Sequence, residues 1–126
     1  MRALRILVVE DDVMVGPLLA EMLEDLGHIV CAVEIDAAKA AVAAARCHPD
    51  LMIVDIGMGD VGSVTAVNDV LRDGLAPHVF VTSDIPRDLA LGPEAVLIQK
   101  PFRGSDIVAA IELATEEPPW AAEARR

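Results

Sequence analysis

The sequence predicts an α/β fold, a doubly wound, five-stranded parallel sheet with helices on both faces. Five short runs of β-branched and other apolar residues alternate with alanine- and leucine-rich segments of helical length. This alternation is typical of βα units around a parallel sheet. The runs are apolar almost throughout, rather than at every second position, as expected for strands that are covered on both faces.

Each predicted strand is a short apolar run followed by polar residues, glycine or proline. In chain order the five strands are Leu4–Val9, Ile29–Val33, Leu51–Asp55, His78–Thr82 and Ala95–Ile98. A spatial order of 2-1-3-4-5 is one of the two common orders of doubly wound sheets, and it is the order we expect here.

Four segments have the periodicity or the end signals of helices. The first, about Val13–Leu26, repeats apolar residues at three- and four-residue spacing and is followed by a glycine that favours a left-handed cap. The second follows Asp36, a candidate N-cap, and ends near Cys47. A further helix is expected at about Ser63–Arg72, and the last follows Gly104.

The connection between the fourth and fifth strands is too interrupted for a full helix. Pro86, Gly92 and Pro93 leave only about Arg87–Leu91 free to be helical. We therefore expect a shortened or irregular fourth helix.

Length and composition favour one globular domain. The chain has 126 residues, of which 54% are hydrophobic and 25% are charged, which is enough for one core. We expect a single domain over residues 1–117, a tail over 118–126 and no output domain. No apolar run approaches the roughly 18 residues of a membrane span, and the first apolar run ends in acids, unlike a signal peptide. The protein is expected to be soluble and cytoplasmic.

The formal charge of −11 would repel nucleic acid and anionic membranes, so the expected partners are proteins or cations. Cys31 and Cys47 have no metal-binding spacing and are expected to be inert thiols. The histidines His28, His48 and His78 are scattered and are expected to be surface or capping groups.

Polar residues collect where the predicted strands end. The first strand is followed by Glu10-Asp11-Asp12, the third ends in Asp55, the fourth ends in Thr82-Ser83-Asp84, and the fifth is followed by Lys100. The second strand ends without such a group. Ligands of open α/β sheets bind beyond the carboxyl ends of the strands. We therefore expect carboxylates, a hydroxyl and an ammonium in one crevice at the carboxyl ends of the strands. Asp12 is expected to serve instead as the N-cap of the first helix.

This set of residues suits a metal and a phosphoryl group together. Clustered carboxylates need a compensating cation, and oxygen ligands with retained waters favour Mg²⁺. An ammonium beside a metal suits a phosphoryl ligand, whose charge needs both. Because aspartate can accept phosphate covalently, Asp55 is the natural acceptor.

Four segments, in order and at these strand ends, resemble the receiver domains of response regulators in bacterial two-component systems. The segments are Val8-Val9-Glu10-Asp11-Asp12, Val54-Asp55, Val81-Thr82-Ser83 and Lys100-Pro101-Phe102. The resemblance covers Arg5 to about Glu116. It implies a flavodoxin-like fold and a single-domain regulator similar to chemotaxis regulators, which signals through protein partners or relays phosphate.

The resemblance also implies a role for each matching residue. Asp55 would be phosphorylated by a histidine kinase or a histidine phosphotransfer protein. Asp11 and Asp55 would bind Mg²⁺ directly, with Glu10 acting through water and the Gly57 carbonyl as a further ligand. Lys100 would pair with the phosphoryl oxygens.

For the remaining residues, the resemblance implies that the Thr82 hydroxyl and the Ser83 amide reach toward the phosphate. It further implies a cis peptide between Lys100 and Pro101.

Two residues and one segment depart from the family pattern. Leu97 stands where an aromatic residue is usual, so a rotating aromatic switch is not expected. Gly59 stands where proline is usual, so a more mobile loop is expected. The shortened fourth helix removes part of the usual output face and points to a subgroup of stand-alone receivers.

Two alternative functions remain open. A phosphatase with an aspartyl-phosphate intermediate would use similar residues, but it carries a second acid two positions after the nucleophile, where this chain has Gly57. A receiver that works without phosphorylation is disfavoured by the intact set of Asp11, Asp55, Thr82 and Lys100.

Overall fold

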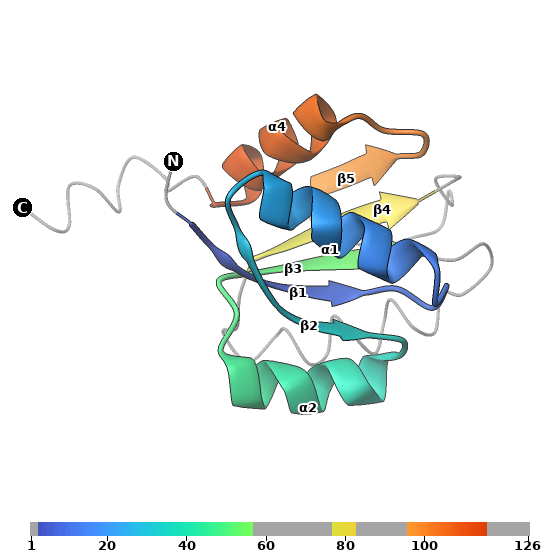
Figure 1. The fold of residues 1–126 in the computed structure, drawn as a ribbon, viewed down its shortest axis with the longest axis vertical. Helices are drawn as coiled ribbons and strands as arrows, with labels where there is room; N and C mark the ends of the chain where they lie inside the picture. Colours follow the sequence, from blue (N-terminus) through green and yellow to red (C-terminus); the bar gives the residue numbers. More distant parts are fainter. Residues whose placement is uncertain (1–2, 57–76, 83–95, 116–126) are drawn as a thin grey trace, which may run out of the picture.

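The computed structural model describes residues 3–56, 77–82 and 96–115. Its centre is a five-stranded parallel sheet in the order β2-β1-β3-β4-β5, which confirms the predicted fold class and strand order (Figure 1). The strands are β1 (Arg5–Val9), β2 (Ile29–Glu34), β3 (Leu51–Ile56), β4 (His78–Thr82) and β5 (Val96–Gln99). Each lies within a residue or so of its predicted position.

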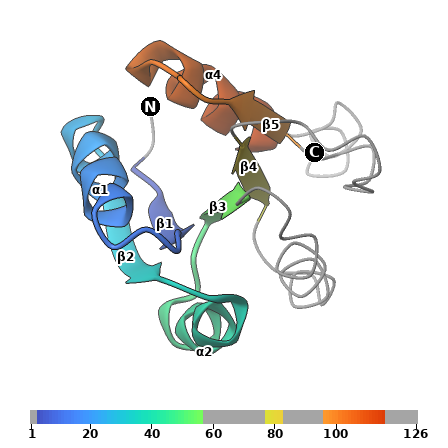
Figure 2. The same cartoon turned by 90° about the vertical axis from the view of Figure 1, so that its right-hand side faces the viewer.

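The described helices lie on both faces of the sheet. Helices α1 (Val15–Asp25) and α4 (Gly104–Thr115) cover one face, and α2 (Ala37–Cys47) covers the other (Figures 1 and 2). None of them is both long enough and apolar enough to cross a membrane within the described part of the chain.

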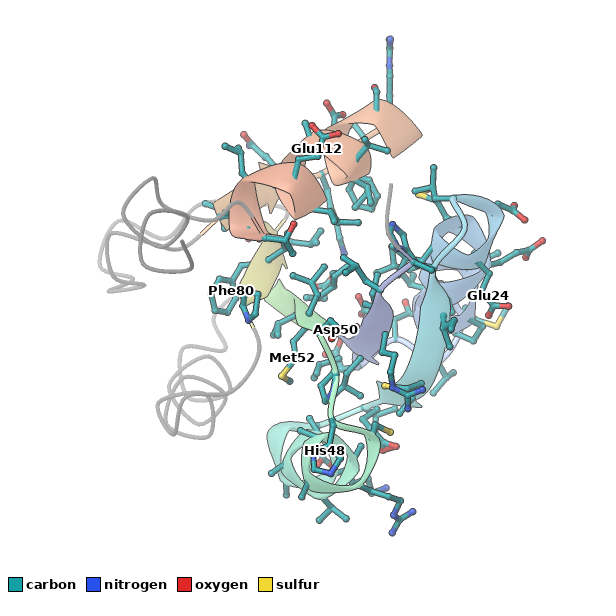
Figure 3. The ribbon with its side chains drawn as sticks, turned by 90° about the vertical axis from the view of Figure 1, so that its left-hand side faces the viewer. Glu24, His48, Asp50, Met52, Phe80 and Glu112 are labelled. Carbon is teal, nitrogen blue, oxygen red and sulfur yellow. The ribbon has the colours of Figure 1, made fainter. Side chains whose placement is uncertain are left out.

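The two faces carry separate cores of different composition. Branched aliphatic side chains fill the face under α1 and α4, among them Leu23, Ile53 and Ile107. On the opposite face, the described side chains that α2 contributes to the buried cluster are the alanines Ala40, Ala43 and Ala44, which pack against large side chains of the sheet. Met52 and Phe80 project from β3 and β4 on the α2 face (Figure 3).

The start of α1 differs from its prediction. The helix begins at Val15, and the N-cap position is Met14, which makes no side-chain cap. Asp12 was predicted as the N-cap and lies two residues earlier. Its carboxylate nevertheless accepts hydrogen bonds from the N–H groups of Met14 (2.8 Å) and Val15 (3.3 Å), because a turn precedes the helix. At the other end Gly27 has φ +98°, as the glycine signal predicts.

The ends of α2 agree with the sequence. The Asp36 carboxylate accepts a hydrogen bond from the Lys39 N–H at 2.8 Å, which is the predicted cap. His48 is the C-cap in a left-handed conformation with φ 50°. This exposed histidine is thus a capping group, as expected.

His28 corrects the expectation of surface histidines. It is only 5% exposed, between α1 and β2, and its Nδ1 accepts a hydrogen bond from the Leu4 N–H at 3.1 Å. Its Nε2 is buried and has no hydrogen-bond partner in the described residues. The ring therefore fixes the start of β1 from inside the protein.

Several predictions fall outside the described residues. They concern the helix at Ser63–Arg72, the shortened segment around Arg87–Leu91, the loop at Gly57 and Gly59, and the tail over 118–126. These remain predictions.

Candidate functional site

Strand register brings the predicted site residues together at the carboxyl ends of the sheet. Val9 of β1 pairs with Val54 of β3, so the residues that follow, Glu10 and Asp55, are neighbours across the strands. Farther along, β3 pairs with β4 up to Thr82. This edge lies at the arrowheads of Figure 1. The fold therefore places acids from two strands beside a hydroxyl-bearing residue.

Asp55 and Lys100 form an ion pair. Their side chains are 7% and 29% exposed, respectively. Burial acts to lower the pKa of Lys100, but the hydrogen bond and the charge of Asp55, helped by the other carboxylates, raise it overall. Lys100 therefore stays charged. It precedes a cis peptide to Pro101, as the resemblance implies.

Thr82 is held beside this pair by the backbone. It is 2% exposed at the end of β4, and its carbonyl accepts a hydrogen bond from the Lys100 N–H at 2.7 Å. The contact ties the end of β4 to the turn that carries the ammonium.

Glu10 is the most unusual group of the site. It is 3% exposed, and its Oε1 accepts a hydrogen bond from the Asp12 N–H at 3.0 Å. Its Oε2 is buried and has no hydrogen-bond partner within the described part of the chain. Burial, followed by the neighbouring Asp55 carboxyl, raises the pKa of Glu10 to about 8. In the absence of a cation, Glu10 is therefore largely protonated at neutral pH.

The described donors fit a hydrated Mg²⁺. Glu10 and Asp55 offer buried carboxylate oxygens next to each other, and Asp11 is exposed beside them. Among the described residues no three acidic, histidine or cysteine side chains form a ready-made metal cage. Mg²⁺ does not need one, because it keeps several waters and binds through one or two carboxylates. The predicted ligand Gly57 and the predicted phosphate contact Ser83 lie outside the described residues.

Sequence reasoning missed how the site is packed. Gly16 of α1 lies against the base of the site, because a Cβ added there would be 2.8 Å from Cγ1 of Val33 and 3.6 Å from Cβ of Glu10. The sequence did carry a signal for this close packing, because Gly16 falls near the start of the predicted first helix and shortly after the acid Glu10 that ends the first strand. Leu97, where the family usually has an aromatic residue, is half-buried and packs against the core on the α2 face.

Comparison with known proteins settles the family. The family model described as "Response regulator receiver domain" matches residues 6–112. The chain belongs to this family. It is a receiver domain of the kind found in two-component response regulators. Receiver domains are signalling domains and are generally not conventional enzymes.

Relatives of this receiver are found in longer regulators. A curated relative, the transcriptional regulatory protein PdtaR of Mycobacterium tuberculosis, is 35% identical over 115 residues, covering 87% of this chain and 56% of the relative. The anti-anti-sigma factor PhyR from Bartonella quintana superposes with a TM-score of 0.84 at 29% identity, covering 100% of this chain and 53% of the other. This receiver thus spans a little over half the length of both.

The structure of an isolated receiver domain is also similar to this chain. The PhyR receiver domain of Erythrobacter litoralis superposes with a TM-score of 0.74 at 27% identity, and the match covers 92% of this chain and 95% of the other. The likeness therefore extends over one whole domain.

Proposed function

We propose that this receiver takes a phosphoryl group on Asp55 in a Mg²⁺-dependent reaction, with a histidine kinase or a histidine phosphotransfer protein as the donor. One observation carries the proposal: the Asp55 carboxylate is held between a buried acid, Glu10, and a charged ammonium, Lys100. This arrangement suits a group that gains negative charge while a cation is bound.

The residues divide the work of the transfer. A carboxylate oxygen of Asp55 attacks phosphorus, and the leaving group departs with the bonding electrons. Lys100 pairs with a phosphoryl oxygen, and the Thr82 hydroxyl and the Ser83 amide contact the others. Glu10, Asp11, Asp55 and the Gly57 carbonyl would hold Mg²⁺. When bound, the metal offsets the charge that gathers on the phosphoryl oxygens.

We further propose that the signal leaves through a protein partner or by phosphate relay. The relatives' names, a transcriptional regulatory protein and an anti-anti-sigma factor, describe whole proteins that are longer than this chain. The charge of −11 supports protein partners over direct contact with nucleic acid or membranes. We also propose a cytoplasmic location, where histidine kinases present their donor groups.

The test is phosphorylation by a small phosphodonor such as acetyl phosphate with Mg²⁺, read by intact mass. We expect one phosphoryl adduct on the wild type, none on Asp55→Asn, and none on the wild type when a chelator removes Mg²⁺. Asp50→Asn is the matched control, because Asp50 sits at the opposite end of the same strand, where it binds the Arg5 N–H. A wild type without adduct contradicts the proposal.

The same samples separate this function from the phosphatase alternative. A receiver modifies itself and does not turn over small phosphate esters. Many turnovers per protein molecule with a chromogenic phosphate ester would favour the phosphatase.

A further inference from the structure

The two cysteines of the chain, far apart in sequence, lie against each other on the α2 face of the sheet. Cys31 belongs to β2, and Cys47 is the last residue of α2. The Cys47 thiol donates a hydrogen bond to the Cys31 carbonyl, with Sγ and O 3.5 Å apart. Both thiols are free and half-buried.

The pairing of β1 with β2 is irregular at Cys31. In the pairing of β1 with β2, Ile6 is matched with Val30 and Leu7 with Ala32, so Cys31 is the extra residue. As a result Cys31 and its neighbour Ala32 both pack against the core on the α2 face, whereas regular alternation would send only one of them there.

A cation lies beside the pair. Arg5 Nε donates to the Cys47 carbonyl at 3.2 Å, which also satisfies one backbone acceptor at the end of α2. Burial, followed by the neighbouring Cys47, raises the pKa of Cys31 to about 11, and the charge of Arg5 acts in the opposite direction. Cys31 therefore stays protonated at neutral pH.

We propose that Cys31 and Cys47 form a reversible disulfide that joins the edge strand β2 to the end of α2. The oxidant is a hydroperoxide or a low-molecular-weight disulfide. This modification site is separate from the acidic site, and the proposal does not depend on phosphorylation.

The reaction with hydrogen peroxide balances in two steps. The Cys47 thiolate attacks a peroxide oxygen, the O–O bond breaks, and a sulfenic acid forms while hydroxide leaves and is protonated to water. The Cys31 thiol then attacks the Cys47 sulfur, the S–S bond forms, and its proton leaves with the sulfenic oxygen as a second water. Two thiols have lost two electrons and two protons.

The test uses the whole reduced protein, treated with glutathione disulfide or dilute hydrogen peroxide without denaturant. We expect an intact mass lower by two hydrogen atoms, loss of both free thiols, a Cys31–Cys47 peptide in a non-reducing digest, and full reversal by dithiothreitol. Because the cross-link closes a loop, the oxidised protein should melt at a temperature higher by roughly 10 °C.

Single-cysteine variants provide the control. Cys31→Ser and Cys47→Ser should each take up one glutathione or form an intermolecular dimer, and neither should show the lower mass. The proposal is overturned if the folded wild type keeps both thiols, carries two glutathiones, dimerises through disulfides, or goes to sulfinic acid without the internal bond. These outcomes are read on the wild type, so a poorly folded variant does not affect them.

Discussion

Glu10 is a carboxyl group in a place that disfavours its charge. It is almost completely buried, one oxygen has no hydrogen-bond donor in the described residues, and the Asp55 carboxyl lies next to it. Without a cation, its ionised form loses solvation and is repelled by its neighbour. The residue is thus suited to a cation-bound state more than to the metal-free protein.

We predict that Glu10→Gln stabilises the metal-free protein by about 1 kcal/mol. The glutamine keeps an oxygen for the Asp12 N–H and replaces the unpaired oxygen with an N–H donor facing Asp55. Thermal unfolding in a chelating buffer measures the effect, and a lower melting temperature for the variant contradicts it.

Neighbouring acids should differ sharply in metal binding. Asp11→Asn is expected to weaken Mg²⁺ binding at least tenfold, because it removes one of the proposed charged ligands. Asp12→Asn should leave the affinity unchanged, because its carboxylate is directed to the N–H groups of Met14 and Val15. Titration of both variants with Mg²⁺ compares them, and equal losses would mean that the ligand is misassigned.

His28 gives the protein a pH dependence of its own. Burial lowers the pKa of His28 below its usual value of 6.5, so the folded state holds the ring neutral. Below about pH 6.5 the unfolded chain takes up a proton that the folded state resists, so the contribution of His28 to the free energy of unfolding falls as the pH falls.

We therefore predict that His28→Gln gains stability relative to the wild type as the pH falls from 7 to 5, because it lacks this contribution. The exposed His48 offers the control, since His48→Gln should keep the wild-type slope. Denaturant titrations at several pH values provide the measurement, and identical slopes in all three proteins would refute the assignment.

At the scale of single residues, the sequence predicted which side chains lie together at the carboxyl ends of the strands, but not how deeply they are buried. Glu10, Asp55, Thr82 and Lys100 could be placed because strand ends converge in a parallel sheet. The burial of Glu10 and His28 could not, because it depends on how closely α1 approaches the sheet.

At the scale of elements, that approach depends on Gly16. A Cβ at this position would be 2.8 Å from the Val33 side chain, closer than packed atoms allow. The glycine lets the first turn of α1 lie directly on β2 and on the stem of Glu10.

Gly16→Ala is predicted to destabilise the protein by about 1–3 kcal/mol, despite the better helix propensity of alanine. Gly104→Ala is the matched control, because a Cβ at the first residue of α4 meets nothing within 4 Å. Chemical denaturation of both variants decides the matter, and an equal or greater stability for Gly16→Ala would rule out the close approach.

The sequence predicted the strands better than the first helix start or the edge-strand register. Strands appear as apolar runs whatever their partners, whereas the start of α1 depends on a turn closed by Asp12. The irregular register at Cys31 leaves no mark in the apolar pattern, and the contact between the two cysteines depends on how α2 packs on β2, so neither could be predicted from the sequence.

At the scale of the whole molecule, the described helices are attached to the sheet by different kinds of side chain. The α1 and α4 face buries branched aliphatic side chains from both helices, while α2 is attached through alanines. Because an alanine removes less apolar area from water than a leucine or isoleucine, α2 contributes less per turn.

Because α2 packs through alanines, we expect it to detach from the sheet at a lower free energy than α1. We predict that its backbone amides exchange with deuterium through partial opening, at least tenfold less protected than those of α1, while the central strands exchange only by global unfolding. Hydrogen exchange followed by mass spectrometry measures this order, and equal protection of α1 and α2 would contradict it. Among the described helices, α2 would then open locally while α1 stays docked on the sheet.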